Sequence, residues 1–118
     1  MLEFNPRVAD QVLVLDCKGR MATGEDLAFF KNFLKQLLLT TDALVVNLEG
    51  VTYMDSGGLS ILVSSYTSAR ERGATMKLAV INSTIRHLFR ITKLLDVFDI
   101  HESVDEAVKG FPHKAASA

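Results

Sequence analysis

Residues 43–62 read ALVVNLEGVTYMDSGGLSIL and join an apolar strand to an amphipathic helix through a polar turn. The apolar run 43–48 predicts the strand, and apolar residues at helical spacing predict a helix over 57–72 that ends at Gly73. The turn places a carboxylate, a hydroxyl and two glycines at the amino end of that helix, where the first backbone N–H groups have no intrahelical partner. These groups and the helix dipole favour anions, so a serine there is suited to carry or recognise a phosphate.

The segment NLEGVTYMDSGGLSIL, residues 47–62, resembles the signature of the STAS family, which reads apolar-D-[ST]-[ST]-G-L after a strand. The resemblance extends from the apolar run 11–17 to the motif VDEAV at 104–108. It implies a small cytoplasmic bacterial domain that binds an anti-sigma factor and so releases a sigma factor. The implied partner is also a serine kinase of the GHKL type, and a phosphatase is a further candidate partner.

The turn departs from the family pattern at one residue. The family's phosphoacceptor precedes the G-L pair, where this chain has Gly57, while Ser56 keeps the preceding hydroxyl. Ser56 is therefore the candidate phosphoacceptor, and Ile61 is expected to be an exposed apolar anchor beside the turn. The alternatives are that the turn only caps the helix and that Ile61 is an ordinary exposed residue. The expected partner-binding residues are Asp55, Ser56, Gly57, Gly58, Ile61 and Ser64.

Length and composition indicate one globular domain. A chain of 118 residues can bury an independent core, and a net charge of −1 gives no electrostatic reason to expect nucleic-acid binding. Cys17 lies in an apolar run and reads as a buried hydrophobe. Neither a signal peptide nor an apolar run near the roughly 20 residues of a membrane span is evident. We expect a cytoplasmic monomer or weak dimer with a domain over 1–111 and a flexible tail over 112–118.

The pattern along the chain predicts an α/β fold, with a mixed, mostly parallel sheet and about four helices. Residues 2–8 and 11–19 read as a hairpin with its turn at Ala9-Asp10, and Pro6 suits an edge strand. A helix over 25–39 is expected to begin at Thr23 as its N-cap. Its apolar stripe is broad enough to suggest burial and comprises Leu27, Phe29, Phe30, Phe33, Leu34, Leu37 and Leu38.

The second half of the chain continues the alternation. We expect a strand over 75–81, a short helix over 84–92 capped by Asn82-Ser83, and a short strand near 98–101. The core face of this helix should be Ile85, Leu88, Phe89 and Thr92. The sequence Ser103-x-x-Glu106 is a capping box that opens a last helix ending at Lys109.

A basic face is expected on the helix over 84–92, where Arg86, Arg90 and Lys93 recur at helical spacing with His87 nearby. A solvated surface is the favoured interpretation. An acidic partner or anionic lipid heads are the alternatives.

The residues give little support to the hypothesis of an enzyme or of a metal-binding protein. The turn matches only half of a G-x-S-x-G motif, no nucleotide-binding glycine loop occurs, and the histidines lack metal-ligand spacing. A phosphoacceptor receiver domain would place an acidic pair after the first strand and a lysine after the last, and neither is present. We therefore expect a binding protein with no catalytic residues, no metal and no cofactor. The alternative is a STAS scaffold subunit of a stress-sensing or lipid-transport complex.

Overall fold

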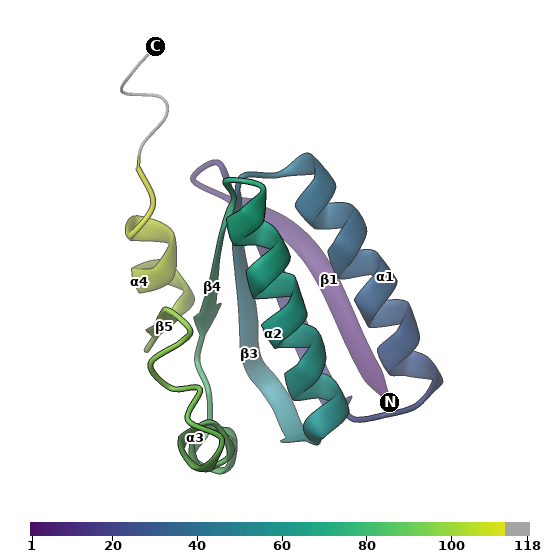
Figure 1. Cartoon of the computed structure of the whole chain (residues 1–118). Helices are drawn as coiled ribbons and strands as arrows, with labels where there is room; N and C mark the ends of the chain where they lie inside the picture. Colours follow the sequence, from purple (N-terminus) through teal and green to yellow (C-terminus); the bar gives the residue numbers. More distant parts are fainter. Residues whose placement is uncertain (113–118) are drawn as a thin grey trace.

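The computed structural model describes residues 1–112, which form a five-stranded sheet in the order β1-β2-β3-β4-β5 with four helices (Figure 1). Strand β1 is antiparallel to β2, and all later neighbours are parallel. The predicted α/β class is confirmed. The elements are β1 (Leu2–Ala9), β2 (Val12–Met21), α1 (Glu25–Thr40), β3 (Ala43–Met54), α2 (Ser56–Glu71), β4 (Thr75–Ala79), α3 (Ser83–Ile91), β5 (Ile100–His101) and α4 (Val104–Lys109).

The first hairpin has the predicted strands, but its turn is one residue later than expected. Asp10 and Gln11 occupy the turn with φ of 49° and 68°, the left-handed conformation that two-residue hairpin loops require. Pro6 lies in β1, the edge strand, where the sheet loses no hydrogen bond through the missing N–H of proline. The amino end of the chain is thereby attached to the parallel sheet.

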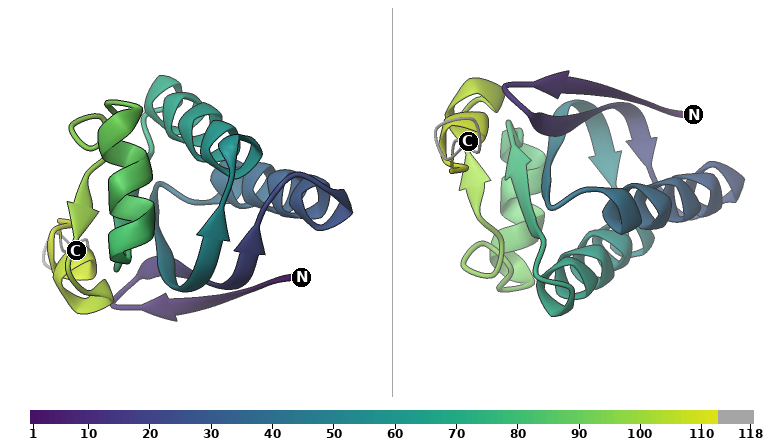
Figure 2. Two further views of the ribbon diagram at one scale, coloured as in Figure 1. Left: turned by 90° about the horizontal axis from the view of Figure 1, so that it is seen from below. Right: turned by 90° about the horizontal axis from the view of Figure 1, so that it is seen from above.

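Three helices cover one face of the sheet and α4 covers the other (Figures 1 and 2). Alternation within the strands separates the two cores. Leu15 and Val46 point into the larger core, while their neighbours Val14 and Val45 point into the smaller one. The central strands are buried on both faces, as their continuous apolar runs predict. Burial also raises the pKa of the Cys17 thiol to about 12, so the predicted role of this cysteine as a buried hydrophobe is confirmed.

Strand β3 is longer than predicted, because it continues past residue 48 to Met54. Its second half pairs with the end of β2, with Val51 opposite Gly19 and Tyr53 opposite Arg20. Val51 and Met54 are buried, so this half also faces the core. The residues that read as the start of the polar turn are therefore part of the sheet.

Two expectations for α1 are wrong. Phe29 is 62% exposed, although the stripe suggested burial, because Phe30 and Leu34 already fill the side that faces the sheet. The N-cap is Gly24 rather than Thr23, and no side chain caps the helix.

The later elements follow the prediction with shifted ends. Strand β4 stops at Ala79, two residues before its expected end, and β5 comprises only two residues. Asn82 caps α3 by accepting a hydrogen bond from the Ile85 N–H. Thr92 is exposed rather than part of the core, because it lies at the C-cap and its hydroxyl donates to the Leu88 carbonyl.

Within residues 1–112, no helix is long and apolar enough to cross a membrane. The expected tail, 112–118, lies outside the described residues except for Pro112.

Candidate functional site

The turn between β3 and α2 lies at the carboxyl edge of the parallel sheet, beside the connection from β2 to α1. Both connections leave neighbouring parallel strands, so their first residues meet at the same edge. The backbone N–H of Asp55 donates to the Met21 carbonyl at 3.3 Å, which joins the two strand ends. Open α/β sheets bind their ligands at this edge.

Asp55 caps α2 with one carboxylate oxygen and holds the neighbouring loop with the other. Its Oδ1 accepts from the N–H groups of Gly57 at 2.9 Å and Gly58 at 3.1 Å. Its Oδ2 accepts from the Thr23 N–H at 2.9 Å, across 32 residues of sequence. The capping reading of the turn is thus confirmed, and Asp55 also fixes a loop that the cap alone would not reach.

The charge of Asp55 follows from these contacts. The Thr23 N–H has the largest effect on the pKa of this carboxyl and lowers it. The Gly58 N–H, the Thr23 hydroxyl and the Gly57 N–H lower it further, against the opposite effect of burial, so the pKa lies below its usual range. Asp55 therefore carries a negative charge at neutral pH and makes its hydrogen bonds as a carboxylate.

The two glycines of the turn serve different purposes. A Cβ on Gly58 would collide with the Met21 carbonyl oxygen and lie 2.8 Å from the Met21 Cγ, so only glycine lets the end of β2 approach α2 this closely. A Cβ on Gly57 would collide instead with the Thr23 hydroxyl oxygen, the end of a side chain that can rotate. Gly57 is not among the positive-φ glycines, so its backbone does not require glycine.

Ser56 is exposed at the first position of α2, as its candidate role requires. Asp55 and Gly57 are partly exposed beside it, whereas Gly58 is buried. The surface of the turn therefore consists of one hydroxyl and a fixed carboxylate at the amino end of a 16-residue helix.

Two expected members of the binding surface lie elsewhere. Ile61 is only 9% exposed and belongs to the larger core, so the expectation that it is an exposed anchor is wrong. It shares its side of α2 with Ser65, Ser68 and Arg72, and those three face α1 across a groove. Ile61 lies one helical turn before Ser65 on that side and is part of the larger core. Ser64 lines the same groove, two helical turns from Ser56.

The β2–α1 loop and the strand ends beside it contribute residues that sequence reasoning did not assign to the site. Thr23 is exposed and bonded to Asp55 through its backbone, and Tyr53 is 40% exposed with the Arg20 guanidinium 4.2 Å from its ring centre. Arg20 and Thr23 also line a depression of about 360 Å³. The parallel order of β2 and β3 is the signal that could have brought this loop to the turn.

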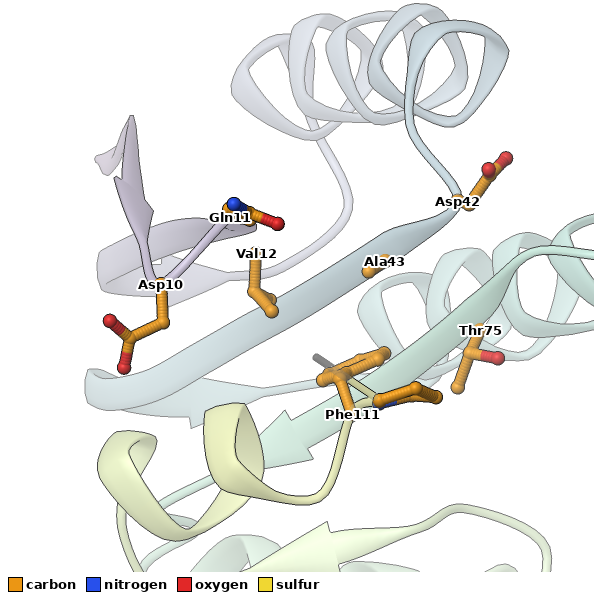
Figure 3. A pocket seen from close by; sticks show the side chains of 8 residues that line it. Asp10, Gln11, Val12, Asp42, Ala43, Thr75 and Phe111 are labelled. Carbon is orange, nitrogen blue, oxygen red and sulfur yellow. The ribbon is translucent and has the colours of Figure 1, made fainter. Parts of the chain in front are cut away.

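A second pocket, of about 180 Å³, lies at the opposite edge of the sheet, where β2, β3 and β4 begin (Figure 3). Val12, Ala43 and Thr75 open onto it from the three strands, and Phe111 lies against it. This pocket is a full strand length from the Asp55 turn. Among the described residues, no group of three or more His, Cys, Asp or Glu side chains could hold a metal ion.

Comparison with known proteins identifies related chains. The family model described as the STAS domain matches residues 3–107. The anti-sigma-B factor antagonist of Bacillus subtilis (strain 168) is 34% identical over 62 residues, which are 52% of this chain and 57% of that protein. The chain is thus matched to little more than half of that relative's length.

Solved structures show the same fold. An anti-sigma factor antagonist from Mycobacterium paratuberculosis superposes with a TM-score of 0.82 at 19% identity, covering 92% of each chain. The Bacillus cell fate determinant SpoIIAA, in its phosphorylated form, superposes with a TM-score of 0.72 at 15% identity over 91% of this chain and 97% of the other. With the family model spanning most of its length, this chain belongs to the STAS domain family.

Proposed function

We propose that this protein is an anti-sigma-factor antagonist, a regulatory protein that binds an anti-sigma factor and so controls release of a sigma factor. One observation carries the proposal: the Asp55 carboxylate joins the β2–α1 loop to the amino end of α2, where Ser56 is exposed. Such a surface is formed in advance, so docking costs little loop ordering. Family membership and the name of the Bacillus subtilis relative support this choice.

The proposed mechanism is binding, without a reaction catalysed by this chain. The partner is an anti-sigma factor that is also a GHKL-type serine kinase, and the setting is the cytoplasm. A phosphate on Ser56 would add about 1.5 to 2 negative charges to a turn that already carries the Asp55 carboxylate. Repulsion and desolvation of that charge would weaken a closely packed interface. A structural neighbour, SpoIIAA, has a phosphorylated form.

The test is capture from a lysate of the native cell, with identification of the bound protein by mass spectrometry. Wild-type protein should retain an anti-sigma factor, and Ser56→Glu should retain at least tenfold less. Thr67→Glu is the matched control, because Thr67 is exposed on the same helix but three turns away. A large transport or stress-sensing assembly in place of an anti-sigma factor would favour the scaffold alternative. Equal loss in both variants would remove the turn from the interface.

Phosphorylation has its own test with the partner so identified. Incubation with ATP, read by intact mass, should label wild type weakly and leave Ser56→Ala unlabelled. Labelling of Ser56→Ala at the level of wild type would exclude Ser56 as the acceptor while leaving the binding proposal standing.

A further inference from the structure

Helices α1 and α2 lie side by side on the larger face (Figure 1), and a groove of about 350 Å³ runs between them. Leu38 and Leu39 supply its apolar surface, the first of them buried and the second 48% exposed. From α2 it is lined by three serines, whose small side chains leave the space open. The lining residues are Lys31, Lys35, Leu38, Leu39, Ser64, Ser65, Ser68 and Arg72.

The groove is positively charged, although the chain as a whole has a net charge of −1. Lys31 and Lys35 lie on the α1 side and Arg72 on the α2 side, and no carboxylate of residues 1–112 lines the groove. All three cations are exposed, and none is within ion-pair distance of an acidic side chain in residues 1–112. Three cations gathered over an apolar surface without counter-charges favour an acidic ligand.

The lining residues form one stripe along each of the two helices. On α1 they recur at i, i+4, i+7 and i+8 from Lys31, and on α2 at i, i+4 and i+8 from Ser64 to Arg72. Each side therefore presents one helical stripe about 12 Å long, from the 1.5 Å rise per residue. A third helix laid along these stripes can place an apolar side chain on Leu39, which is 48% exposed.

We propose that the α1–α2 groove binds an acidic amphipathic helix of a protein partner. Carboxylates at i and i+4 of that helix would form ion pairs with Lys31 and Lys35. A carboxylate on its other side would bind the guanidinium group of Arg72. This surface is separate from the antagonist site, because Ser64 lies two turns along α2 from Ser56. The two surfaces therefore allow two partners to be held at once.

The test uses a synthetic 18-residue helical peptide with leucine on one face and glutamate at i and i+4 on its flanks. The control peptide has glutamine in place of each glutamate. The glutamate peptide should bind wild type, and Lys31→Gln/Lys35→Gln/Arg72→Gln should bind it at least tenfold more weakly. Lys18→Gln/Arg86→Gln/Arg90→Gln is the matched protein control, because it removes the same charge elsewhere and should retain the affinity of wild type.

Location is read by amide chemical shifts, which should change at Ser64, Ser65 and Ser68 and stay constant at Asp55 and Ser56. Both triple variants should melt within a few degrees of wild type, since all six side chains are on the surface. Equal binding of the two peptides, or equal weakening in the two triple variants, would overturn the proposal. Failure of the glutamate peptide to bind would also overturn the proposal if wild type, but not the groove variant, bound phosphatidylglycerol vesicles or formed a dimer.

Discussion

The two faces of the sheet are stabilised by different means. The larger face lies under α1, α2 and α3 and buries aromatic and leucine side chains, Phe30 and Phe89 among them, with no exposure to water. The smaller face lies under α4, a helix of six residues, and its core is mostly valine and alanine. A buried lysine, Lys77, also lies on this face and pairs with Asp99 at 2.9 Å.

The difference shows which face supplies most of the free energy of folding and which face has a stability that depends on pH. Apolar burial scales with area and is indifferent to pH, so the larger face should supply most of the stability. The smaller face depends on one ion pair and on the aromatic ring of Phe111, which lies 4.9 Å from the Lys77 Nζ. Its stability should therefore depend on charge.

The largest expected effect comes from removing one phenylalanine from each face. Phe89→Ala should lower the free energy of unfolding by about 3–5 kcal/mol, since its ring is fully buried against Phe98. Phe111→Ala should cost roughly half as much, because it follows the last helix and the thin layer around it can collapse into the space. Urea denaturation of both variants measures the difference. Equal losses would show that α4 is packed as rigidly as the helices of the larger face.

A closer comparison uses adjacent residues of one strand. Val45 and Val46 are both fully buried in β3 and point to opposite faces. Val46→Ala should cost about 2 kcal/mol from lost burial and the cavity that remains. Val45→Ala makes the same chemical change in the same strand and should cost less, because α4 can move inward. A larger loss for Val45→Ala would show that the smaller face, under α4, is the more rigidly packed of the two.

Much of this architecture was readable from the sequence, because it rests on local rules. The hydrophobic period gave the order of the elements, and Ser103 caps α4 as its motif predicts, by accepting from the Glu106 N–H at 3.0 Å. The start of α2 was predicted within one residue, because a capping aspartate marks it.

The predictions were wrong where contacts with a segment distant in sequence determine the environment of a residue. The helical period shows that Ile61 lies off the main stripe of α2, but not that it is buried in the larger core. Likewise, the hydrogen bond from Thr23 to Asp55 spans 32 residues and depends on the order of the strands. Half of the candidate surface, the β2–α1 loop, was therefore beyond a residue-by-residue reading.

The ion pair of the smaller face gives an asymmetric prediction. Asp99→Asn should cost about 1 kcal/mol, at the low end for an unsatisfied buried group, because Lys77 is 8% exposed and would lose its counter-charge. Lys77→Met should cost less, since the Asp99 side chain is 50% exposed and water would solvate it. Thermal melts at neutral pH compare the two. A larger loss in Lys77→Met would mean that the lysine acts mainly through its packing on Phe111.

The same pair sets a pH dependence. Burial alone would raise the pKa of Asp99, but its hydrogen bond and charge interaction with Lys77, aided by His101, outweigh this and lower it below its usual 3.8. A depressed folded pKa gives stability that is present above pH 3.8 and is lost as pH falls through the folded value. Wild type should thus lose more stability than Asp99→Asn on acidification below pH 4. Parallel curves for the two proteins would contradict this role.

A comparably small effect concerns the turn, where Gly57 lies close to Leu27 of the larger core. A Cβ added to Gly57 would collide with the Thr23 hydroxyl oxygen and lie 3.1 Å from the Leu27 Cδ2. Gly57→Ser should therefore cost about 1 kcal/mol, at the low end for overpacking, because Thr23 is exposed and can rotate away with the loss of its side-chain hydrogen bond to Asp55. In a Thr23→Ala background the main obstacle is gone, and the same substitution should cost about half as much.

A double-mutant cycle separates this steric coupling from backbone strain. Strain at Gly57 would be the same in both backgrounds, so additive losses from Thr23→Ala and Gly57→Ser would show that the hydroxyl contact is irrelevant. Non-additive losses would show that Thr23 occupies the space of a side chain at position 57.

The same pair of variants can be compared as substrates in the kinase assay. If the partner requires a hydroxyl at 57, Thr23→Ala/Gly57→Ser should be labelled faster than Gly57→Ser, because its serine need not displace Thr23 and the Asp55 cap can keep its geometry. Equal labelling of the two, together with a coupled stability cycle, would mean that the kinase itself moves the β2–α1 loop as it binds.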